Sequence, residues 1–451
     1  MSALRPLEFL KAEPTEVGIT VEATVDAQTG SPVVQIPIPL TEGRDGFGPK
    51  LALTHGGYDP LSPFAFGWAL VGLPHIEVDT REGVPVYDGD EIVRYQGQEL
   101  VPLEETGRPS SFARGDFDVR CYRPRVEVDA VRAERWVHRV TRRVHWRVRR
   151  SDGSVWVFGR RADGESRIAD PARPEHTFRW LLESAHDRLG NAMVVRHQAE
   201  DARGLESASL DATRFRDATS QRYVKRILYG NGAPFGEDDA SMPEWHFESV
   251  FDYGDHPEAD PGPEPSLPWS ARADIGTTCR PGFMVRTRRL CRRILMFHRF
   301  PAELGEPATL IDALELGSAA GRDATVLFGV RRSGYGATSS EQRTTPWSRL
   351  EYTRSDGTDF FRAVRAPLLG AGTELHDLFG EGLPGLLTRD AGGVRYARNL
   401  GSGDFGAHEL LAAWPVGLEE ASLGDFDGDG NTELVQATGP NAGYYRLDRR
   451  A

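Results

Sequence analysis

Cysteine is scarce in this sequence. The 451 residues contain three, Cys121, Cys279 and Cys291, and none of them forms a CxxC pair. Three cysteines are too few, and odd in number, for a disulfide framework. We therefore expect three reduced thiols in ordinary packing positions, in a protein made in a reducing cytoplasm.

Long apolar runs are also missing. The N-terminal stretch MSALRPLEFLKAEPTEVG has no apolar segment between a basic start and a small-residue cleavage site, so we expect no conventional signal peptide. No uncharged apolar run approaches the length of a membrane span. The sequence thus predicts no direct membrane insertion, and any export must use a route without a classical signal.

Positive charge is outweighed by negative charge. The chain has 54 Lys and Arg against 67 Asp and Glu, a formal net charge of -13. This sign disfavours non-specific binding to nucleic acid or to anionic membranes. The basic segment CRPGFMVRTRRLCRRILMFHRF (279–300) is therefore interpreted as a solvated or salt-bridged strand pair, and we expect no nucleic-acid partner.

Helical periodicity with caps is scarce, whereas alternating strand patterns are common. Residues 31–40, SPVVQIPIPL, alternate but carry prolines, which predicts an edge strand. Residues 142–159 place apolar residues on one face and turn at Asp152-Gly153, which predicts a hairpin, and residues 178–201 repeat this arrangement. With 49 glycines and 30 prolines supplying turns, the predicted fold class is all-β.

Sequence motifs for common catalytic and nucleotide-binding sites are weak. The GxGxxG matches at 380–385 and 401–406 lie in hairpin contexts without a following helix, and GRDGFGPK (43–50) lacks the hydroxyl residue of a P-loop. We find no G-x-S-x-G elbow. The sequence therefore predicts no catalytic residues and no enzymatic activity.

A weak internal repeat occupies the last part of the chain. Residues 375–401 and 423–448 align, so that Asp377 falls on Asp425 and Glu381 on Asp429. A period near fifty residues is the scale of propeller blades. We place the preferred domain boundary in the Pro-rich stretch 334–348 and predict a large β domain followed by two propeller-like units.

The second repeat contains the most explicit chemical motif, SLGDFDGDGNTELVQ (422–436). Its acidic spacing fits a short D-x-D-x-D-G-x-x-[DE] calcium loop, because Ca²⁺ prefers several oxygen ligands from a flexible loop. The predicted ligands of a structural Ca²⁺ are Asp425, Asp427, Asp429, Asn431 and Glu433. An EF-hand is disfavoured because Gln436 stands where a bidentate Glu is needed. The alternative is an empty Asp/Gly turn.

The first copy of this loop is degenerate. Phe379 and Gly385 stand where the second and last carboxylates of the calcium loop should be. We therefore expect no cation in the first repeat.

Many blocks along the chain together carry a family resemblance. They include GRDGFGPK, PFAFGW, VPVYDGDE, ERWVHRVTRRVHWRV, TFRWLLES, DRLGN, YVKRILYGN, FDYGD and LHDLFGEGLPGLL, and they span residues 18–448. In this order they resemble the SpvB-like domain, and most closely the B component of bacterial insecticidal toxin complexes.

The resemblance implies four segments. Residues 1–17 would be an N-terminal tail, 18–348 an SpvB-like β domain that forms part of a hollow shell, 349–364 a connecting segment, and 365–451 the first, incomplete part of a β-propeller. The propeller would dock on the pore-forming A-like component. The C-like, cargo-bearing component would close the shell around a toxic cargo. Synthesis would occur in the bacterial cytoplasm, followed by release to the extracellular space.

Two other functions remain open from the sequence. The chain resembles the part of SpvB that carries an ADP-ribosyltransferase, although residues 337–343, ATSSEQR, are only a faint echo of that enzyme's motifs and no Glu-x-Glu follows. The calcium loop alone would also suit a calcium-dependent adhesion or recognition module.

Overall fold

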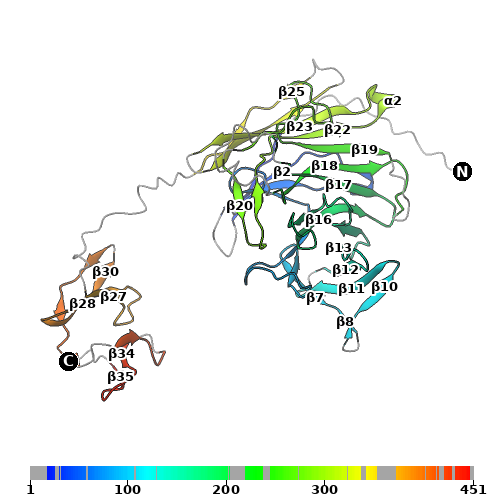
Figure 1. Ribbon diagram of the computed structural model, residues 1–451. Helices are drawn as coiled ribbons and strands as arrows, with labels where there is room; N and C mark the ends of the chain where they lie inside the picture. Colours follow the sequence, from blue (N-terminus) through cyan, green and yellow to red (C-terminus); the bar gives the residue numbers. More distant parts are fainter. Residues whose placement is uncertain are drawn as a thin grey trace. The chain divides into compact units, whose positions relative to one another are not determined.

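The computed structural model describes residues 18–25, 30, 32–56, 59–105, 108–127, 129–201, 203, 219–236, 244–272, 274–321, 324–336, 342–352, 372–401, 403–412, 414–415, 421–428 and 432–446. The chain divides into two compact units, Met1–Glu351 and Tyr352–Ala451 (Figure 1). The predicted tail, 1–17, and most of the predicted connecting segment lie outside the described residues. The predicted all-β class is confirmed, because nearly every regular element is a strand.

The first unit begins with a four-stranded antiparallel sheet. Its strands are β1 (Glu22–Val25), β2 (Pro32–Pro37), β3 (Ala52–His55) and β4 (Trp68–Val71), and the short 3-10 turn η1 (Arg44–Gly46) precedes β3. The prediction of an edge strand at 31–40 is wrong, since β2 pairs with both β1 and β3. Its prolines are the first and last residues of the strand, where a missing N–H interrupts the ladder least.

Eight antiparallel strands then close into a ring. In ring order they are β5 (His75–Val78), β6 (Val93–Tyr95), β7 (Gln98–Pro102), β11 (Phe117–Pro124), β12 (Arg132–His138), β13 (Val144–Arg149), β14 (Val155–Phe158) and β16 (Thr177–His186), which pairs back with β5. Two short strands pair with members of the ring, β10 (Ser111–Arg114) with β11 and β15 (Arg167–Ala169) with β16, while β8 (Glu104–Glu105) and β9 (Arg108–Pro109) pair with each other.

Aromatic side chains fill the interior of the ring. Trp146 contacts Tyr122 at a ring-centroid distance of 5.2 Å and Trp180 at 6.0 Å, and Phe158 meets Tyr95 edge to face at 6.0 Å. All five belong to the main buried cluster. Rings of about eight strands are just wide enough to be filled by side chains, so this one is a packed core.

Strand β16 also starts an open antiparallel sheet, because its last residues pair with β17. The sheet continues in order through β17 (Ala192–Ala199), β18 (Arg222–Asn231), β19 (Trp245–Asp252), β22 (Arg293–His298), β23 (Thr309–Ala320) and β24 (Thr325–Gly334), with β25 (Arg343–Thr344) and β26 (Ser348–Arg349) both on β24. A separate hairpin, β20 (Gly276–Thr278) and β21 (Val285–Thr287), and the helical turn α2 (Pro301–Leu304) complete the unit.

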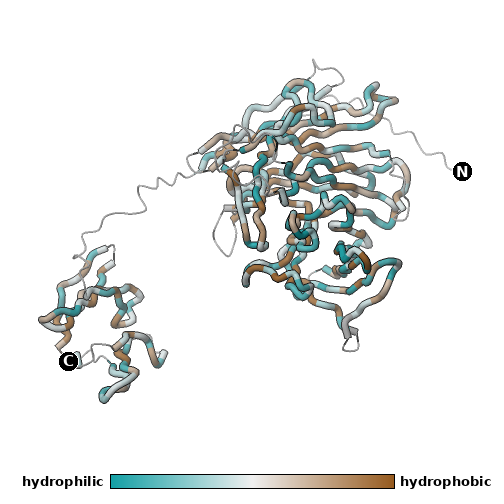
Figure 2. The backbone as a smooth tube through the Cα atoms, viewed as in Figure 1, coloured by the Kyte–Doolittle hydropathy of each residue, from teal (hydrophilic) through white to brown (hydrophobic). Residues whose placement is uncertain are grey.

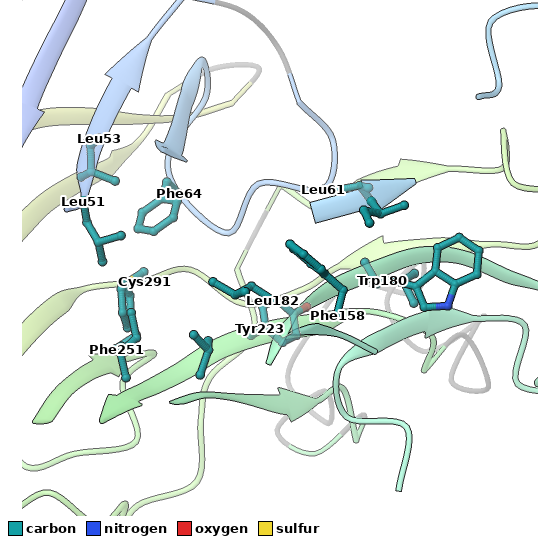
Figure 3. Packing of buried hydrophobic residues seen from close by; sticks show 14 of the residues in the cluster. Leu51, Leu53, Leu61, Phe64, Phe158, Trp180, Leu182, Tyr223, Phe251 and Cys291 are labelled. Carbon is teal, nitrogen blue, oxygen red and sulfur yellow. The ribbon is translucent and has the colours of Figure 1, made fainter. Parts of the chain in front are cut away.

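The two predicted hairpins are confirmed. Strands β13 and β14 are joined by a turn in which Gly153 has φ of +80°, and β16 and β17 by a turn in which Gly190 has φ of +79°. Apolar and polar residues alternate along β13, whose sequence is Val-His-Trp-Arg-Val-Arg, and Figure 2 shows hydrophobic and hydrophilic segments following one another along the strands of this unit. Figure 3 shows Leu53 of β3 in the same buried cluster as Phe251 of β19, so one core joins the first sheet to the open sheet.

Most of the basic segment 279–300 is buried, although Cys279, Arg280 and Arg292 are exposed. Arg288 and Arg289 are both 0% exposed, and Arg289 forms a buried ion pair with Glu200. The guanidinium of Arg289 also lies 4.3 Å from the ring of Trp269. The salt-bridged alternative is therefore the correct one, and the residues between β21 and β22 form a loop rather than a strand.

The second unit contains two small antiparallel sheets of similar strand order. The first consists of β27 (Thr373–His376), β28 (Gly385–Asp390), β29 (Gly393–Ala397) and β32 (Glu409–Leu410), and the second of β33 (Ser422–Gly424), β34 (Glu433–Gln436) and β35 (Gly443–Tyr445). A short pair, β30 (Asn399–Gly401) and β31 (Asp404–Phe405), follows the first sheet. The sequence repeat thus corresponds to a repeated three-strand meander, and its assignment to a propeller remains a prediction.

Across the residues that the structure describes, no helix is long and apolar enough to cross a membrane.

Candidate metal loop and its neighbours

The predicted calcium loop joins β33 to β34. Because Gly424 pairs with Glu433 in the antiparallel ladder, the residues that open and close the loop lie at the same end of the sheet. One carboxylate oxygen each from Asp425, Asp427 and Glu433 lies within 4.8 Å of the others. The other two predicted ligands, Asp429 and Asn431, lie outside the described residues.

Backbone hydrogen bonds hold two of these carboxylates in place. The N–H of Gly428 donates to Asp425 Oδ1 at 2.7 Å, and the N–H of Phe426 donates to Glu433 Oε2 at 2.8 Å. Glu433 is only 1% exposed, whereas Asp425 and Asp427 are exposed. The loop is therefore a turn closed by one buried carboxylate, with two carboxylates on its outer side.

Arg446 brings a positive charge of the chain itself to this group of carboxylates. The guanidinium of Arg446, just after β35, contacts the carboxylate of Asp427. Three carboxylates held within a few ångström of each other repel one another, so a positive charge beside them is favourable. Arg446 supplies one such charge, and a hard divalent cation coordinated by the same oxygens would supply a larger one. Sequence spacing alone did not identify Arg446.

The first repeat replaces the metal ligands with aromatic packing. Asp377 keeps the turn, because its carboxylate accepts the N–H groups of Glu381 at 2.9 Å and Gly382 at 2.6 Å. Phe379 instead packs on Tyr396 at a centroid distance of 5.4 Å.

Tyr396 also excludes a side chain at the last ligand position of this first loop. A Cβ at Gly385 would lie 2.3 Å from the Tyr396 hydroxyl, which donates to the carbonyl of His376 at 3.1 Å. In the first loop, aromatic side chains therefore stand where the second loop has carboxylates, and they close the turn.

The two loops are linked directly. The hydroxyl of Thr432 donates to the carbonyl of Asp377 at 2.6 Å, which joins the second loop to the first. Between the repeats lies a groove of about 770 Å³, whose apolar lining includes Leu378, Tyr396, Trp414 and Leu434. The sequence did not predict this contact or this groove.

The glycine-rich segments dismissed from the sequence are connections between strands. Residues 380–385 link β27 to β28, and residues 401–406 include the short strand β31. Residues 43–50 contain only the 3-10 turn η1. None of these segments leads into a helix among the described residues, so none presents a helix N-terminus to a phosphate group.

A packed antiparallel ring, its sheet extension and a second unit built from two repeats define a large all-β protein with a short acidic loop. The sequence pattern of the SpvB family, described as Salmonella virulence plasmid 65kDa B protein, matches residues 26–300. The chain belongs to the SpvB family, and the predicted resemblance is confirmed.

Curated relatives match the first unit. The mono(ADP-ribosyl)transferase SpvB of Salmonella choleraesuis (strain SC-B67) is 33% identical over an alignment of 302 residues, and the match covers 63% of this chain and 50% of the relative. The chain therefore spans about half the length of the curated relatives it matches. The structure of the N-terminal domain of effector protein SpvB from Salmonella typhimurium strain LT2 is 32% identical, with a TM-score of 0.61, and the match covers 66% of this chain and 98% of that one.

Toxin-complex structures match more of the chain. The Photorhabdus luminescens Tc holotoxin pore is 30% identical with a TM-score of 0.74, and the match covers 95% of this chain and 21% of that one. The TcdB2-TccC3-TEV structure is 28% identical with a TM-score of 0.75, over 97% of this chain and 22% of that one. A match of this extent includes residues of both units.

Proposed function

We propose that this chain is a non-enzymatic structural and docking component of a bacterial toxin complex. In this proposal the SpvB-like unit forms part of the shell around a toxic cargo, and the second unit begins a propeller that docks on the pore-forming component. The observation that carries the proposal is the extent of the matches: toxin-complex chains are similar over 95–97% of this chain, whereas the SpvB N-terminal domain is similar over 66%.

The architecture of the first unit supports a wall-forming role. The interior of the strand ring is filled by large side chains such as Trp146 and Phe158, both 0% exposed. The sheet continues from the ring through seven paired strands, β16 to β24, and gives a broad antiparallel surface. A rigid sheet of this size suits a partition between two compartments better than a site that must open and close.

Reconstitution with the cargo-bearing partner tests this role. The full chain is mixed with the C-like component of the producing bacterium, and the mixture is treated with protease while the cargo is followed by immunoblot. We expect the two proteins to co-elute in size-exclusion chromatography and the cargo to resist digestion. Separate elution, with the cargo digested as fast as in the C-like component alone, would rule out the shell role.

The second candidate is a carrier for an SpvB-type ADP-ribosyltransferase. The 33% identity over 302 residues to proteins of that name favours it. This function places the catalytic residues outside residues 1–451. It predicts that the purified chain transfers no label from NAD to protein, and that a longer product of the same gene does. An active 451-residue chain would contradict both proposals, because each treats these residues as non-catalytic.

We propose in addition that Asp425, Asp427, Asp429, Asn431 and Glu433 hold a structural Ca²⁺. The support is the grouping of three of these carboxylates within 4.8 Å around a backbone turn. A cation there would fasten β33 to β34 in a sheet whose own buried cluster is small, with Ala421 and Leu434 as its buried members. Metal binding would thus contribute folding free energy to the second unit.

A calcium-dependent recognition module would need the same loop. In such a module EGTA would abolish ligand binding, whereas removal of a purely structural Ca²⁺ would lower only stability. For localisation we propose synthesis in the bacterial cytoplasm and release to the extracellular space, as befits a toxin component.

A further inference from the structure

Two arginines occupy equivalent positions in the two repeats of the second unit. Tyr396 of β29 and Tyr444 of β35 each pair with the third residue of the strand before them, β28 and β34 respectively. Each tyrosine also lies 19 residues after the first aspartate of the loop in its own repeat. Two residues after these tyrosines stand Arg398 and Arg446. The strand register therefore makes Arg446 the counterpart of Arg398.

Each of these arginines reaches a carboxylate in the loop of its own repeat. In the first repeat the guanidinium of Arg398 lies 2.5 Å from the carboxylate of Glu381 and 5.7 Å from the ring centre of Phe379. In the second repeat the guanidinium of Arg446 contacts the carboxylate of Asp427. The two arginine side chains are similarly exposed, at 55% and 60%. The same strand end thus supplies a positive charge to the loop in both repeats.

The two loops differ in how much negative charge the arginine meets. The first loop has Phe379 at the position of Asp427, whereas the second gathers Asp425, Asp427 and Glu433 within 4.8 Å. Glu433 is 1% exposed and accepts the N–H of Phe426, and no basic side chain among the described residues lies within ion-pair distance of it. A buried carboxylate beside two others is costly unless positive charge lies close by. The second loop therefore needs a cation more than the first does.

We propose that Arg446 is an internal competitor for the cation of the second loop. Its guanidinium holds Asp427 while the loop carries no metal, and it is displaced into solvent when Ca²⁺ binds. This inference rests on the Ca²⁺ site proposed above and adds the residue that sets the affinity of that site. In the first repeat, where we expect no cation, the counterpart Arg398 keeps its place permanently.

Displacement follows because the arginine and the metal need the same carboxylate. Ca²⁺ binds several carboxylate oxygens directly, whereas the guanidinium of Arg446 is held by an exposed ion pair. Breaking an exposed pair of this kind changes an equilibrium by at most about fivefold. A guanidinium that stayed beside the bound metal would add like-charge repulsion, which falls when the side chain turns into solvent. Arg446 therefore weakens Ca²⁺ binding without preventing it.

Titration of the chelator-treated full chain with Ca²⁺, followed by calorimetry, tests the proposal. R446Q removes the charge at the second loop, and the matched control R398Q removes the equivalent charge in the first repeat. We expect R446Q to lower the dissociation constant of Ca²⁺ at least about threefold and R398Q to leave it unchanged. R446K, which keeps the charge, should stay near the wild-type value. In EGTA, R446Q should also lower the melting temperature of the second unit, whereas saturating Ca²⁺ should remove that difference.

The possible failures are distinguishable. If the wild type binds Ca²⁺ and R446Q binds it equally or more weakly, the competitor role is refuted while the Ca²⁺ site stands. A gain in R398Q as large as that in R446Q would also refute it, because net charge alone would then explain the effect. No binding by any variant at millimolar Ca²⁺ would refute the site and this inference together. If R446Q does not fold in EGTA, R446M keeps the length of the side chain without its charge and must show the same gain.

Discussion

Two buried histidines should make the first unit sensitive to mild acid. His145 on β13 and His197 on β17 are 5% and 8% exposed, and a ring nitrogen of each, Nε2 and Nδ1 respectively, is buried without a hydrogen-bond partner. A proton added there would be a buried charge among arginines. Burial first, and the neighbouring arginines second, lower the pKa of each histidine to about 3.

The sign and size of the effect follow from linkage. Below pH about 6.5 the unfolded chain protonates both imidazoles while the folded protein does not, so the unfolded state binds more protons and stability falls as pH falls toward 3. Each unit of pH below that value lowers the free energy of unfolding by about 1.4 kcal/mol per histidine. At pH 5 the two histidines together therefore lower the free energy of unfolding by roughly 4 kcal/mol relative to pH 7.5. That is a large share of the ~5–15 kcal/mol typical of a folded domain.

Urea unfolding followed by tryptophan fluorescence at pH 7.5, 6 and 5 measures this loss. Other buried histidines act in the same direction, so the variant H145Q/H197Q isolates the two. Its stability should fall by roughly 4 kcal/mol less than that of the wild type between pH 7.5 and pH 5. If the variant shows the full wild-type loss, these two imidazoles are protonated in the folded protein and the account of their burial is wrong.

Three further predictions concern stability. Asp255→Ala should lower the free energy of unfolding of the first unit by about 3–5 kcal/mol, because it leaves the buried ammonium of Lys225 without its carboxylate partner at 2.8 Å. The double variant Lys225→Met, Asp255→Asn, which removes both charges, should lose far less stability in the same urea assay. Calcium at 100 times its dissociation constant should stabilise the second unit by about 2.7 kcal/mol in calorimetry, an effect lost in Asp427→Asn but kept in Asp404→Asn. Gly385→Ala should lower the calorimetric transition of the second unit, because its Cβ meets a tyrosine hydroxyl; an unshifted transition would show that this tyrosine moves freely.

Local signals in the sequence predicted much of the fold. Asp152-Gly153 and the turn before Asn191 specify hairpins through residues that accept positive φ. The alternation of apolar and polar residues predicted the strands on either side of these turns. The prediction that the prolines of residues 31–40 mark an edge strand failed at β2. The prolines of β2 stand at the two ends of the strand, so their position, and not their presence, decides whether the strand can pair on both sides. Closure of the ring could not be predicted, since the pairing of β16 with β5 joins residues about a hundred positions apart.

The candidate metal loop was predictable because its ligands are close in sequence. Three of the five predicted residues are brought together by a single strand connection, which spacing alone describes. Arg446 and Thr432 were missed because their contacts, to Asp427 and to the carbonyl of Asp377, depend on how strands and repeats pack.

The most direct test of the toxin-complex role is native mass spectrometry of the assembly that a tagged copy of the chain brings out of its producing cells. The account predicts a particle of fixed stoichiometry in which the chain is accompanied by the C-like component, with the pore-forming A-like component joining it in whole-cell extracts. A chain recovered alone, or only as copies of itself, from cells that express both of those components would contradict it.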